Sequence, residues 1–185
     1  KSGKMFACEH DETVPDILVI GKALGGGIMP IAAVLAKPEL DILGDYAIGH
    51  YTHEKNPVSS QAALTTIQII EEEGLVENAA KLGHHALERL KNLKDEHPSI
   101  GDVRGRGFLF GVELVEEKSI KKPAKDLAEE VFYRCLKNGL SFKISMGNVL
   151  TFSPPLILKK SQMDFAIDTI SECLRDAEKN QGIIK

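Results

Sequence analysis

Two short apolar runs, at positions 17–20 and 31–36, stand out near the start of the chain. Neither run alternates with polar residues, which is typical of strands that are covered on both faces. Three consecutive glycines, Gly25 to Gly27, lie between the runs and follow a single lysine, Lys22. The pattern therefore predicts two buried strands joined by a glycine-rich turn.

Helical periodicity dominates the middle of the chain. Pro57, a residue suited to the first turn of a helix, and Gly74 bound a predicted helix over 57–73. Apolar residues then recur at three- and four-residue steps over 75–93. This spacing predicts an amphipathic helix that ends near Pro98.

The pattern after this helix predicts three more strands. The glycine-rich VRGRG segment at 103–107 is expected to be a turn that leads into a strand over 108–115. Two further short strands, near 140–144 and 149–152, are expected to meet at a turn over 146–148.

Two more helices complete the predicted elements. A charged helix is predicted over 124–138, and the segment 161–164 resembles a capping box for a last helix. We expect the inward face of that last helix to consist of Ala166, Ile170, Cys173 and Ala177. The chain thus reads as an α/β protein whose character changes near Gly74, which predicts one domain over 1–74 and another over 75–185.

Composition and charge are those of a globular protein. Of the 185 residues, 43% are hydrophobic and 27% are charged, and the formal net charge is −4. Binding to nucleic acid requires clustered lysine and arginine, which the sequence lacks, so we expect no nucleic-acid partner. The cysteines Cys8, Cys135 and Cys173 form no CxxC pair, which signals neither a disulfide framework nor a zinc site and favours the cytoplasm.

The sequence gives no sign of a membrane segment. No apolar run approaches the ~20 residues that a helix needs to span a bilayer, and the first ten residues lack the pattern of a signal peptide. The start of the chain also lacks an initiator methionine and reads like the middle of a domain. We therefore expect no membrane partner, no export, and a chain that is a fragment.

Lys22 invites a chemical interpretation because of its two neighbours, a strand and a glycine turn. Most lysines are exposed and have no special role. At the carboxyl end of a buried strand, however, a lysine points toward the crevice where open α/β sheets bind ligands. A nucleotide P-loop has its glycines before the lysine, so that interpretation fails on order. A Schiff base with pyridoxal 5′-phosphate (PLP), which needs a partly desolvated amine, fits.

Several motifs resemble one family, in the same order along the chain. PDILVIGKALGGGIMPIAAVLA is similar to the cofactor-lysine segment of the class III aminotransferases, PLP enzymes of fold type I. KSGKMFACEH, GHYTHEKNP, IGDVRGRGFLFGVELV and NVLTFSPPL are similar to further family segments. The resemblance implies that residues 1–74 end the large cofactor domain of fold type I and that residues 75–185 form a small α+β C-terminal domain.

The resemblance also implies roles for individual residues. Lys22 carries PLP as a Schiff base and moves a proton during catalysis, and Thr52 reaches across a homodimer to the phosphate of the neighbouring subunit's cofactor. The helix that begins after Asn56 has free N–H groups that favour such an anion. Without the family, Thr52 is interpreted as a loop hydroxyl that caps its own backbone.

Four other polar residues are left out of the expected site. His50 and His53 are ligand types at i and i+3, but no third ligand is evident, so we expect no metal. Arg104 and Arg106 are potential anion ligands. We expect them instead to position a strand by hydrogen-bonding to nearby carbonyl groups.

Thr151 departs from the family pattern. Many members that act on α-amino acids have an arginine at the aligned position, where its guanidinium grips the substrate α-carboxylate. A neutral hydroxyl cannot replace that charged group, so either another group binds the acid or the substrate amine has no adjacent carboxylate. We expect an aminotransferase that uses an amine or ω-amino acid such as 4-aminobutyrate and an oxo acid, with Thr151 as a candidate substrate-binding residue.

Other reactions and a non-catalytic role stay open. The family also includes lyases and epimerases, and the C-terminal half is similar to dialkylglycine decarboxylase, so the same cofactor is compatible with elimination, decarboxylation or epimerisation. In the family, the acidic partner of the pyridinium nitrogen and a phosphate loop lie upstream of the cofactor lysine, and neither is in this chain. We therefore expect the chain alone to be inactive. A non-catalytic α/β fragment in which Lys22 is incidental is the third interpretation.

Overall fold

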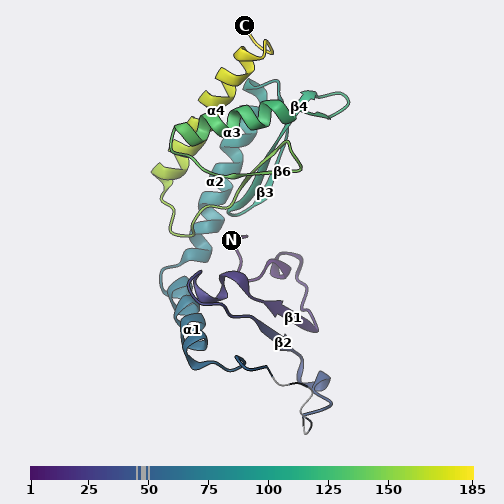
Figure 1. Ribbon diagram of the computed structural model, residues 1–185, viewed down its shortest axis with the longest axis vertical. Helices are drawn as coiled ribbons and strands as arrows, with labels where there is room; N and C mark the ends of the chain where they lie inside the picture. Colours follow the sequence, from purple (N-terminus) through teal and green to yellow (C-terminus); the bar gives the residue numbers. More distant parts are fainter. Residues whose placement is uncertain (45, 47–48, 50) are drawn as a thin grey trace. The chain divides into compact units, whose positions relative to one another are not determined.

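The computed structural model describes residues 1–44, 46, 49 and 51–185. The chain divides into two compact units, one formed by Phe6–Leu75 and the other by Lys1–Met5 together with Val76–Lys185. Each unit has its own sheet (Figure 1).

The unit Phe6–Leu75 is built on a two-stranded sheet. Strands β1 (Ile17–Ile20) and β2 (Ala33–Ala36) pair antiparallel along their whole length. The other elements are the short 3₁₀ helices η1 (Ala7–Asp11), η2 (Lys22–Gly25) and η3 (Pro38–Leu40) and the long helix α1 (Pro57–Glu72). The predicted helix over 57–73 is confirmed to within one residue, since α1 starts at Pro57 and ends at Glu72. Gly74, the predicted stop, has a φ of 60°, which lies outside the helical region.

The two strands of this unit are largely exposed. Val19 is 70% exposed and Val34 is 67% exposed, so the prediction that both strands are covered on both faces is wrong for the described chain. The sheet has two strands and Ala63 is the buried residue of α1. Two strands and one helix do not supply layers for both faces of a sheet, and the apolar sequence therefore meets solvent here.

The unit that contains Val76–Lys185 is built on a five-stranded antiparallel sheet in the order β3-β4-β7-β6, with β5 beside β4. Its strands are β3 (Ile100–Arg106), β4 (Leu109–Glu117), β5 (Lys122–Pro123), β6 (Lys143–Ser145) and β7 (Val149–Phe152). The predicted turn over 146–148 is confirmed. Met146 and Gly147 have positive φ values of 55° and 83° there, as tight hairpin turns often require.

The VRGRG segment is part of a strand and was wrongly predicted as a turn. Residues 103–106 belong to β3, and the chain reverses at Gly107, whose φ is 56°. A Cβ atom added at Gly105 would lie 2.4 Å from Cβ of Phe110. Gly105 therefore allows the two strands of the hairpin to approach closely, which is a different use of glycine from the turn that the sequence suggested.

Three helices share one core with this sheet: α2 (Leu75–Glu96), α3 (Lys125–Lys137) and α4 (Lys160–Asn180). The helices α3 and α4 pack against each other, and α3 contacts strands β4, β6 and β7. Alternate strand residues such as Val112 and Leu150 are fully buried in the core, because successive side chains of a strand point to opposite faces.

Helix α4 begins slightly before its predicted start. Lys159 is the N-cap, and its backbone N–H donates to Oε1 of Gln162 at 2.9 Å, so the predicted capping box at 161–164 is displaced by two residues. Of the predicted inward face, Ile170, Cys173 and Ala177 are buried, whereas Ala166 is only half-buried.

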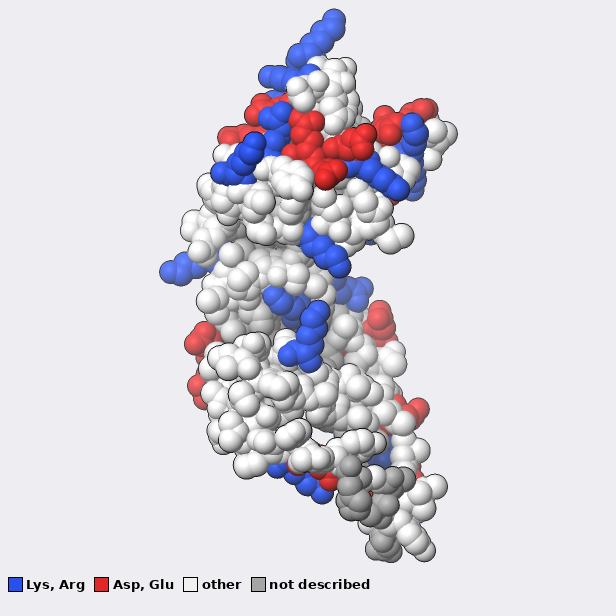
Figure 2. Space-filling model, viewed as in Figure 1, with Lys and Arg blue, Asp and Glu red and all other residues white. Residues whose placement is uncertain are grey.

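Charged side chains of both signs gather over α3, α4 and the β4–β5 hairpin (Figure 2). Interspersed charge of this kind is typical of a solvated surface. Among the described helices, none is long and apolar enough to cross a membrane.

Candidate active site

Lys22 lies directly after β1 and has an unusual backbone conformation. Its φ is 54°, in the left-handed region that non-glycine residues rarely adopt, and its side chain is exposed. The preceding residue, Gly21, is extended, with a φ of 177°. A left-handed non-glycine residue costs roughly 1–2 kcal/mol and is found most often where function requires it.

The glycines after Lys22 are packed on one side and open on the other. Gly26 has a φ of 69°, and a Cβ atom there would lie 2.9 Å from Oγ1 of Thr66 in α1. Gly27 has a φ of 79°, and no atom lies within 4 Å of its would-be Cβ. The turn therefore rests on α1 while leaving space beside it for a ligand.

Thr52 is exposed in the turn that precedes α1. Within the described part of the chain its hydroxyl has no hydrogen-bond partner, so the backbone cap considered from the sequence is not formed there. Instead Asn56 caps the helix: its side-chain oxygen accepts hydrogen bonds from the N–H groups of Val58 and Ser59 at 3.0 and 3.2 Å. These two N–H groups are not free, and that part of the prediction is wrong because asparagine is itself a strong N-cap.

Thr151 is half-buried in the middle of β7, where it pairs with Gly111 of β4 and Lys143 of β6. Its hydroxyl donates to Oγ of Ser145 at 2.9 Å, and its Oγ1 lies 3.3 Å from the carbonyl oxygen of Val149. Thr151 also lines a largely apolar hollow of about 590 Å³ together with residues of α4. The position thus combines a hydroxyl pair with apolar surroundings, and it has no positive charge of its own.

Arg104 binds carboxylates and not the carbonyl groups expected from the sequence. Its Nη1 donates to Asp102 Oδ2 at 2.8 Å and to Glu113 Oε2 at 2.6 Å. The hydrogen bond to Asp102, followed by the one to Glu113, raises the pKa of the guanidinium above its usual value. Asp102 and Glu113 thus neutralise Arg104, and the expected carbonyl partners are replaced by carboxylates, one of which comes from the neighbouring strand β4.

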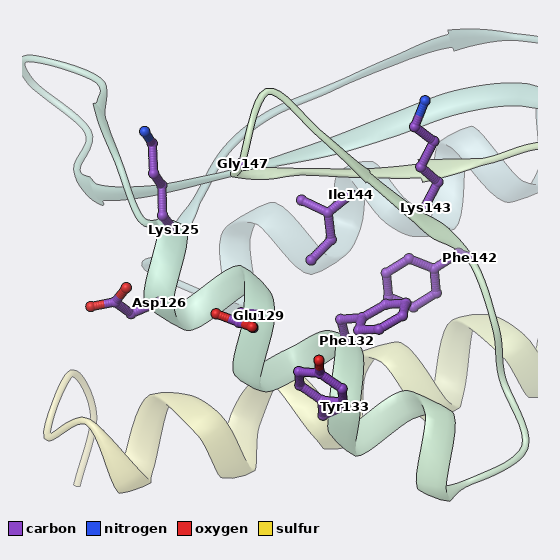
Figure 3. A pocket seen from close by; sticks show the side chains of 9 residues that line it. All are labelled: Lys125, Asp126, Glu129, Phe132, Tyr133, Phe142, Lys143, Ile144 and Gly147. Carbon is purple, nitrogen blue, oxygen red and sulfur yellow. The ribbon is translucent and has the colours of Figure 1, made fainter.

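A second hollow, of about 510 Å³, lies between α3 and β6 (Figure 3). The rings of Phe132 and Phe142 meet edge to face in it, with centroids 5.5 Å apart. In Figure 3, Lys143 lies above these rings, and Lys125, Asp126 and Glu129 lie to one side of them. None of the residues expected in the site from the sequence lines this hollow.

The predicted site residues are distributed over the two units. Lys22 and Thr52 belong to Phe6–Leu75, and Thr151 belongs to the unit with Val76–Lys185. His50 lies outside the described residues. Among the residues that the structure describes, no three or more histidine, cysteine, aspartate or glutamate side chains are placed to hold a metal ion.

Sequence reasoning missed the partner of Thr151. Ser145 supplies the oxygen to which Thr151 donates, and Lys143 lies directly opposite Thr151 on β6. The predicted turn over 146–148 places Lys143 opposite Thr151, since residues equally distant from a turn face each other across the strands, but it does not identify Ser145, which lies opposite Val149.

The sequence matches the family model of class III aminotransferases over residues 1–174. The chain belongs to the class III aminotransferases. The resemblance inferred from the motifs is thereby confirmed, and so is the α/β fold. Members of the family are PLP dependent, which confirms the predicted cofactor.

The curated relatives of this class III chain have names that indicate different reactions. The chain is 44% identical to an (R)-1-hydroxy-2-aminoethylphosphonate ammonia-lyase of Vibrio splendidus, over 94% of this chain and 36% of the relative. It is 42% identical to a leucine/methionine racemase of Thermococcus litoralis, over 98% of this chain and 41% of the relative. The chain thus spans about two fifths of the length of these relatives.

A solved transaminase structure has a similar fold. The omega transaminase of Pseudomonas jessenii, determined in complex with PMP, matches with a TM-score of 0.89 and 32% identity. The match covers 98% of this chain and 42% of that structure.

The surroundings of Lys22 are chemically suited to PLP. Lys22 is exposed and forms no ion pair with any described residue, so the described part of the chain does not provide the partial desolvation expected from the sequence. In the glycine turn that follows, no atom lies within 4 Å of the would-be Cβ of Gly27. An aldehyde cofactor requires an accessible amine and room for a flat ring. The exposed Lys22 meets the first requirement, and the described residues leave open space beside Gly27.

Proposed function

We propose that the intact protein is an aminotransferase that moves an amino group from an amine or ω-amino acid, such as 4-aminobutyrate, to an oxo acid. The observation that supports this most strongly is the left-handed conformation of Lys22, which presents an exposed amine at the end of β1. Membership of the class III family adds the reaction class.

Lys22 and Thr52 are the residues proposed to hold PLP. Lys22 would hold the cofactor through its Nζ, and its amine, once displaced by the substrate, would accept the proton from the amine-bearing carbon of the substrate and deliver it to C4′ of the cofactor. Thr52 donates its hydroxyl hydrogen to the phosphate of the partner subunit's cofactor in a homodimer. Bound PLP supplies the electron sink that stabilises negative charge at the substrate carbon.

The neutral side chain of Thr151 supports the proposal that the substrate has no α-carboxylate. Its hydroxyl hydrogen is already donated to Ser145, and a hydroxyl lacks the paired charged donors with which a guanidinium holds a carboxylate. A substrate whose amine stands far from its acid does not need such a clamp. The apolar hollow beside Thr151 favours a carbon chain at this position.

A second candidate function is elimination of ammonia from the substrate. The 44% identical relative of Vibrio splendidus is an ammonia-lyase that acts on a hydroxy-aminoethylphosphonate. Lyases and transaminases of this family share a cofactor and differ in the bond that breaks. The racemase relative adds epimerisation as a third outcome of the same chemistry.

Reduction with borohydride tests the assignment of Lys22. The full-length protein is reduced, digested and analysed by mass spectrometry, and we expect a phosphopyridoxyl group on the peptide that contains Lys22. The variant Lys22→Ala is the control and should lose the label together with several orders of magnitude in rate. Label on another lysine, or none at all, contradicts the assignment and favours the non-catalytic interpretation.

A panel of substrates then distinguishes the reactions. Aminotransfer from 4-aminobutyrate requires an added oxo acid and produces a new amino acid, whereas elimination releases ammonia without any oxo acid. Epimerisation changes the optical rotation of a chiral amino acid and produces neither.

The variant Thr151→Arg tests substrate choice. We expect kcat/KM for α-amino acids to rise about tenfold or more, because a bidentate charge-assisted contact contributes more than about 1.4 kcal/mol. Thr151→Lys is the matched control, since it adds charge without the planar pair of donors. An unchanged preference in both variants shows that the substrate acid is bound elsewhere.

A further inference from the structure

Two buried thiols lie next to each other between α3 and α4. Cys135 of α3 is fully buried and Cys173 of α4 is 4% exposed. Both are free. Asn138 follows Cys135 by three positions at the end of α3, on the same side of that helix, and its Nδ2 lies 3.6 Å from Sγ of Cys173. Cys135 and Cys173 therefore face each other where α3 packs against α4. No local sequence pattern links the two cysteines, which are 38 positions apart.

A surface hollow of about 490 Å³ leads to only one of these thiols. Its lining includes Cys173 but not Cys135, together with the polar side chains Glu130, Tyr133, Arg134, Lys137, Asn138 and Asp176. Cys173 is therefore the thiol that a small solute meets first. Cys135 lies behind it, within the core.

The hollow offers hydrogen-bond donors and positive charge to the Cys173 sulfur. Nδ2 of Asn138 donates to Sγ of Cys173 at 3.6 Å. The Arg134 guanidinium interacts chiefly with Glu130, which raises the pKa of Arg134, and also electrostatically with Asp176 and Cys173. A sulfur near cationic and donor groups is the type that attacks oxidants, although Glu130 and Asp176 offset part of this charge.

We propose that Cys173 and Cys135 form an oxidation site in which Cys173 reacts with a small hydroperoxide and Cys135 then closes a disulfide between α3 and α4. Nothing in the aminotransferase reaction uses either residue. The modification is therefore separate from the proposed function.

The two steps balance with a hydroperoxide as the only added reactant. In the first step the Cys173 sulfur attacks one peroxide oxygen, an S–O bond forms, the O–O bond breaks, and the leaving hydroxide takes up the thiol proton to become water. In the second, the Cys135 sulfur attacks the sulfenic acid, an S–S bond forms, and the S–O bond breaks. The departing hydroxide takes the Cys135 proton, so two thiols and one hydrogen peroxide give a disulfide and two waters.

The order of attack follows from the environments of the two thiols. Burial, and next the neighbouring Cys173, raise the pKa of the Cys135 thiol, so Cys135 remains protonated and unreactive toward solvent oxidants. It reacts only with a partner that is already oxidised and in contact with it. Cys8 is half-buried in η1 of the other unit and lies in no such pair, which makes it an internal control.

The test treats the full-length protein with hydrogen peroxide and maps its peptides under non-reducing conditions. We expect a Cys135–Cys173 cross-linked peptide, two hydrogen atoms lighter than the sum of its parts and split by dithiothreitol. In Cys135→Ser, dimedone should trap a sulfenic acid on Cys173, whereas in Cys173→Ser no adduct should form on Cys135. Replacing Cys8 by serine should leave the cross-link unchanged.

Two results overturn the proposal. One is oxidation confined to Cys8 while both core cysteines stay reduced. The other is oxidation of Cys173 to a sulfinic acid in the wild-type protein without any cross-link, which means that the thiols cannot reach disulfide geometry. A shift of the urea midpoint of the oxidised wild type, absent from Cys135→Ser and reversed by dithiothreitol, provides a second readout that does not depend on mass spectrometry.

Discussion

Lys22 has a backbone conformation that lysine does not favour. A φ of 54° is strained for any residue with a Cβ atom, and the preceding strand and the packed glycine turn impose it. Glycine would adopt this φ without steric cost, but it has no side-chain amine. The strain is thus explained if the side chain, and not the backbone, is the reason for lysine at this position.

Two substitutions of Lys22 separate backbone strain from chemistry. Lys22→Gly and Lys22→Ala both remove the amine, but only glycine relieves the left-handed strain. We expect the glycine variant to be about 1 kcal/mol more stable than the alanine variant in urea unfolding of the cofactor-free, full-length protein. Ala23→Gly is the control and should destabilise, because Ala23 is not left-handed. Equal stability of the two Lys22 variants contradicts the strain.

At the scale of elements, α2 and α4 are joined by charged groups around Asp164. Oδ1 of this residue lies 2.6 Å from Nε2 of His85 and 3.0 Å from Nη1 of Arg89, and its Oδ2 lies 2.6 Å from Nζ of Lys160. The hydrogen bond to His85, followed by that to Lys160, holds the pKa of the Asp164 carboxyl well below its usual range. A single carboxylate therefore joins two helices far apart in the sequence.

Asp164→Asn should weaken this connection in a pH-dependent way. A lowered folded-state pKa stabilises the folded protein fully above the unfolded pKa of about 4, and this stabilisation is lost as the pH falls through the folded value. We expect the variant to be about 1–2 kcal/mol less stable in urea at neutral pH, with the difference shrinking below about pH 4. Asp168→Asn is the control: the Asp168 carboxylate pairs with Arg89 and is 60% exposed, so the expected loss is below about 0.5 kcal/mol. If the stability difference between Asp164→Asn and the wild type stays unchanged below about pH 4, the charge of the Asp164 carboxylate is not its cause.

At the scale of the whole molecule, the proposed site needs more than one chain. Lys22 and Thr52 are assigned to different active sites of a homodimer, because Thr52 is proposed to contact the cofactor of the partner subunit. The division at residues 74 and 75 into a cofactor domain and a small domain also stays a prediction, although the compact unit with Lys22 ends at Leu75.

Mixing two inactive variants tests the shared site. In a heterodimer of Lys22→Ala and Thr52→Ala subunits, one site receives its lysine from the second subunit and its threonine from the first, so it is complete. We expect co-refolded full-length subunits to recover up to about a quarter of the wild-type activity and cofactor content, since half of the dimers formed are mixed and each has one good site. Thr52→Ser is the control and should need no complementation. Failure of the mixture to exceed its separate components means that Thr52 serves its own subunit.

Local sequence signals alone determined much of this protein. Proline, glycine and apolar spacing predicted α1, α2 and the hairpin at 146–148, because helix ends and tight turns depend on near neighbours. The ordered motifs likewise sufficed for the family and its cofactor. They also singled out Lys22 by its place between a strand and glycines.

Only the tertiary structure decided the features that join distant segments. It placed Arg104 between two carboxylates, paired His85 of α2 with Asp164 of α4, and buried Cys135 and Cys173 where α3 packs against α4. It also gave Lys22 its left-handed backbone and left β1 and β2 exposed. These outcomes depend on strand register, helix packing and the layers available to cover a sheet, and no window of local sequence contains that information.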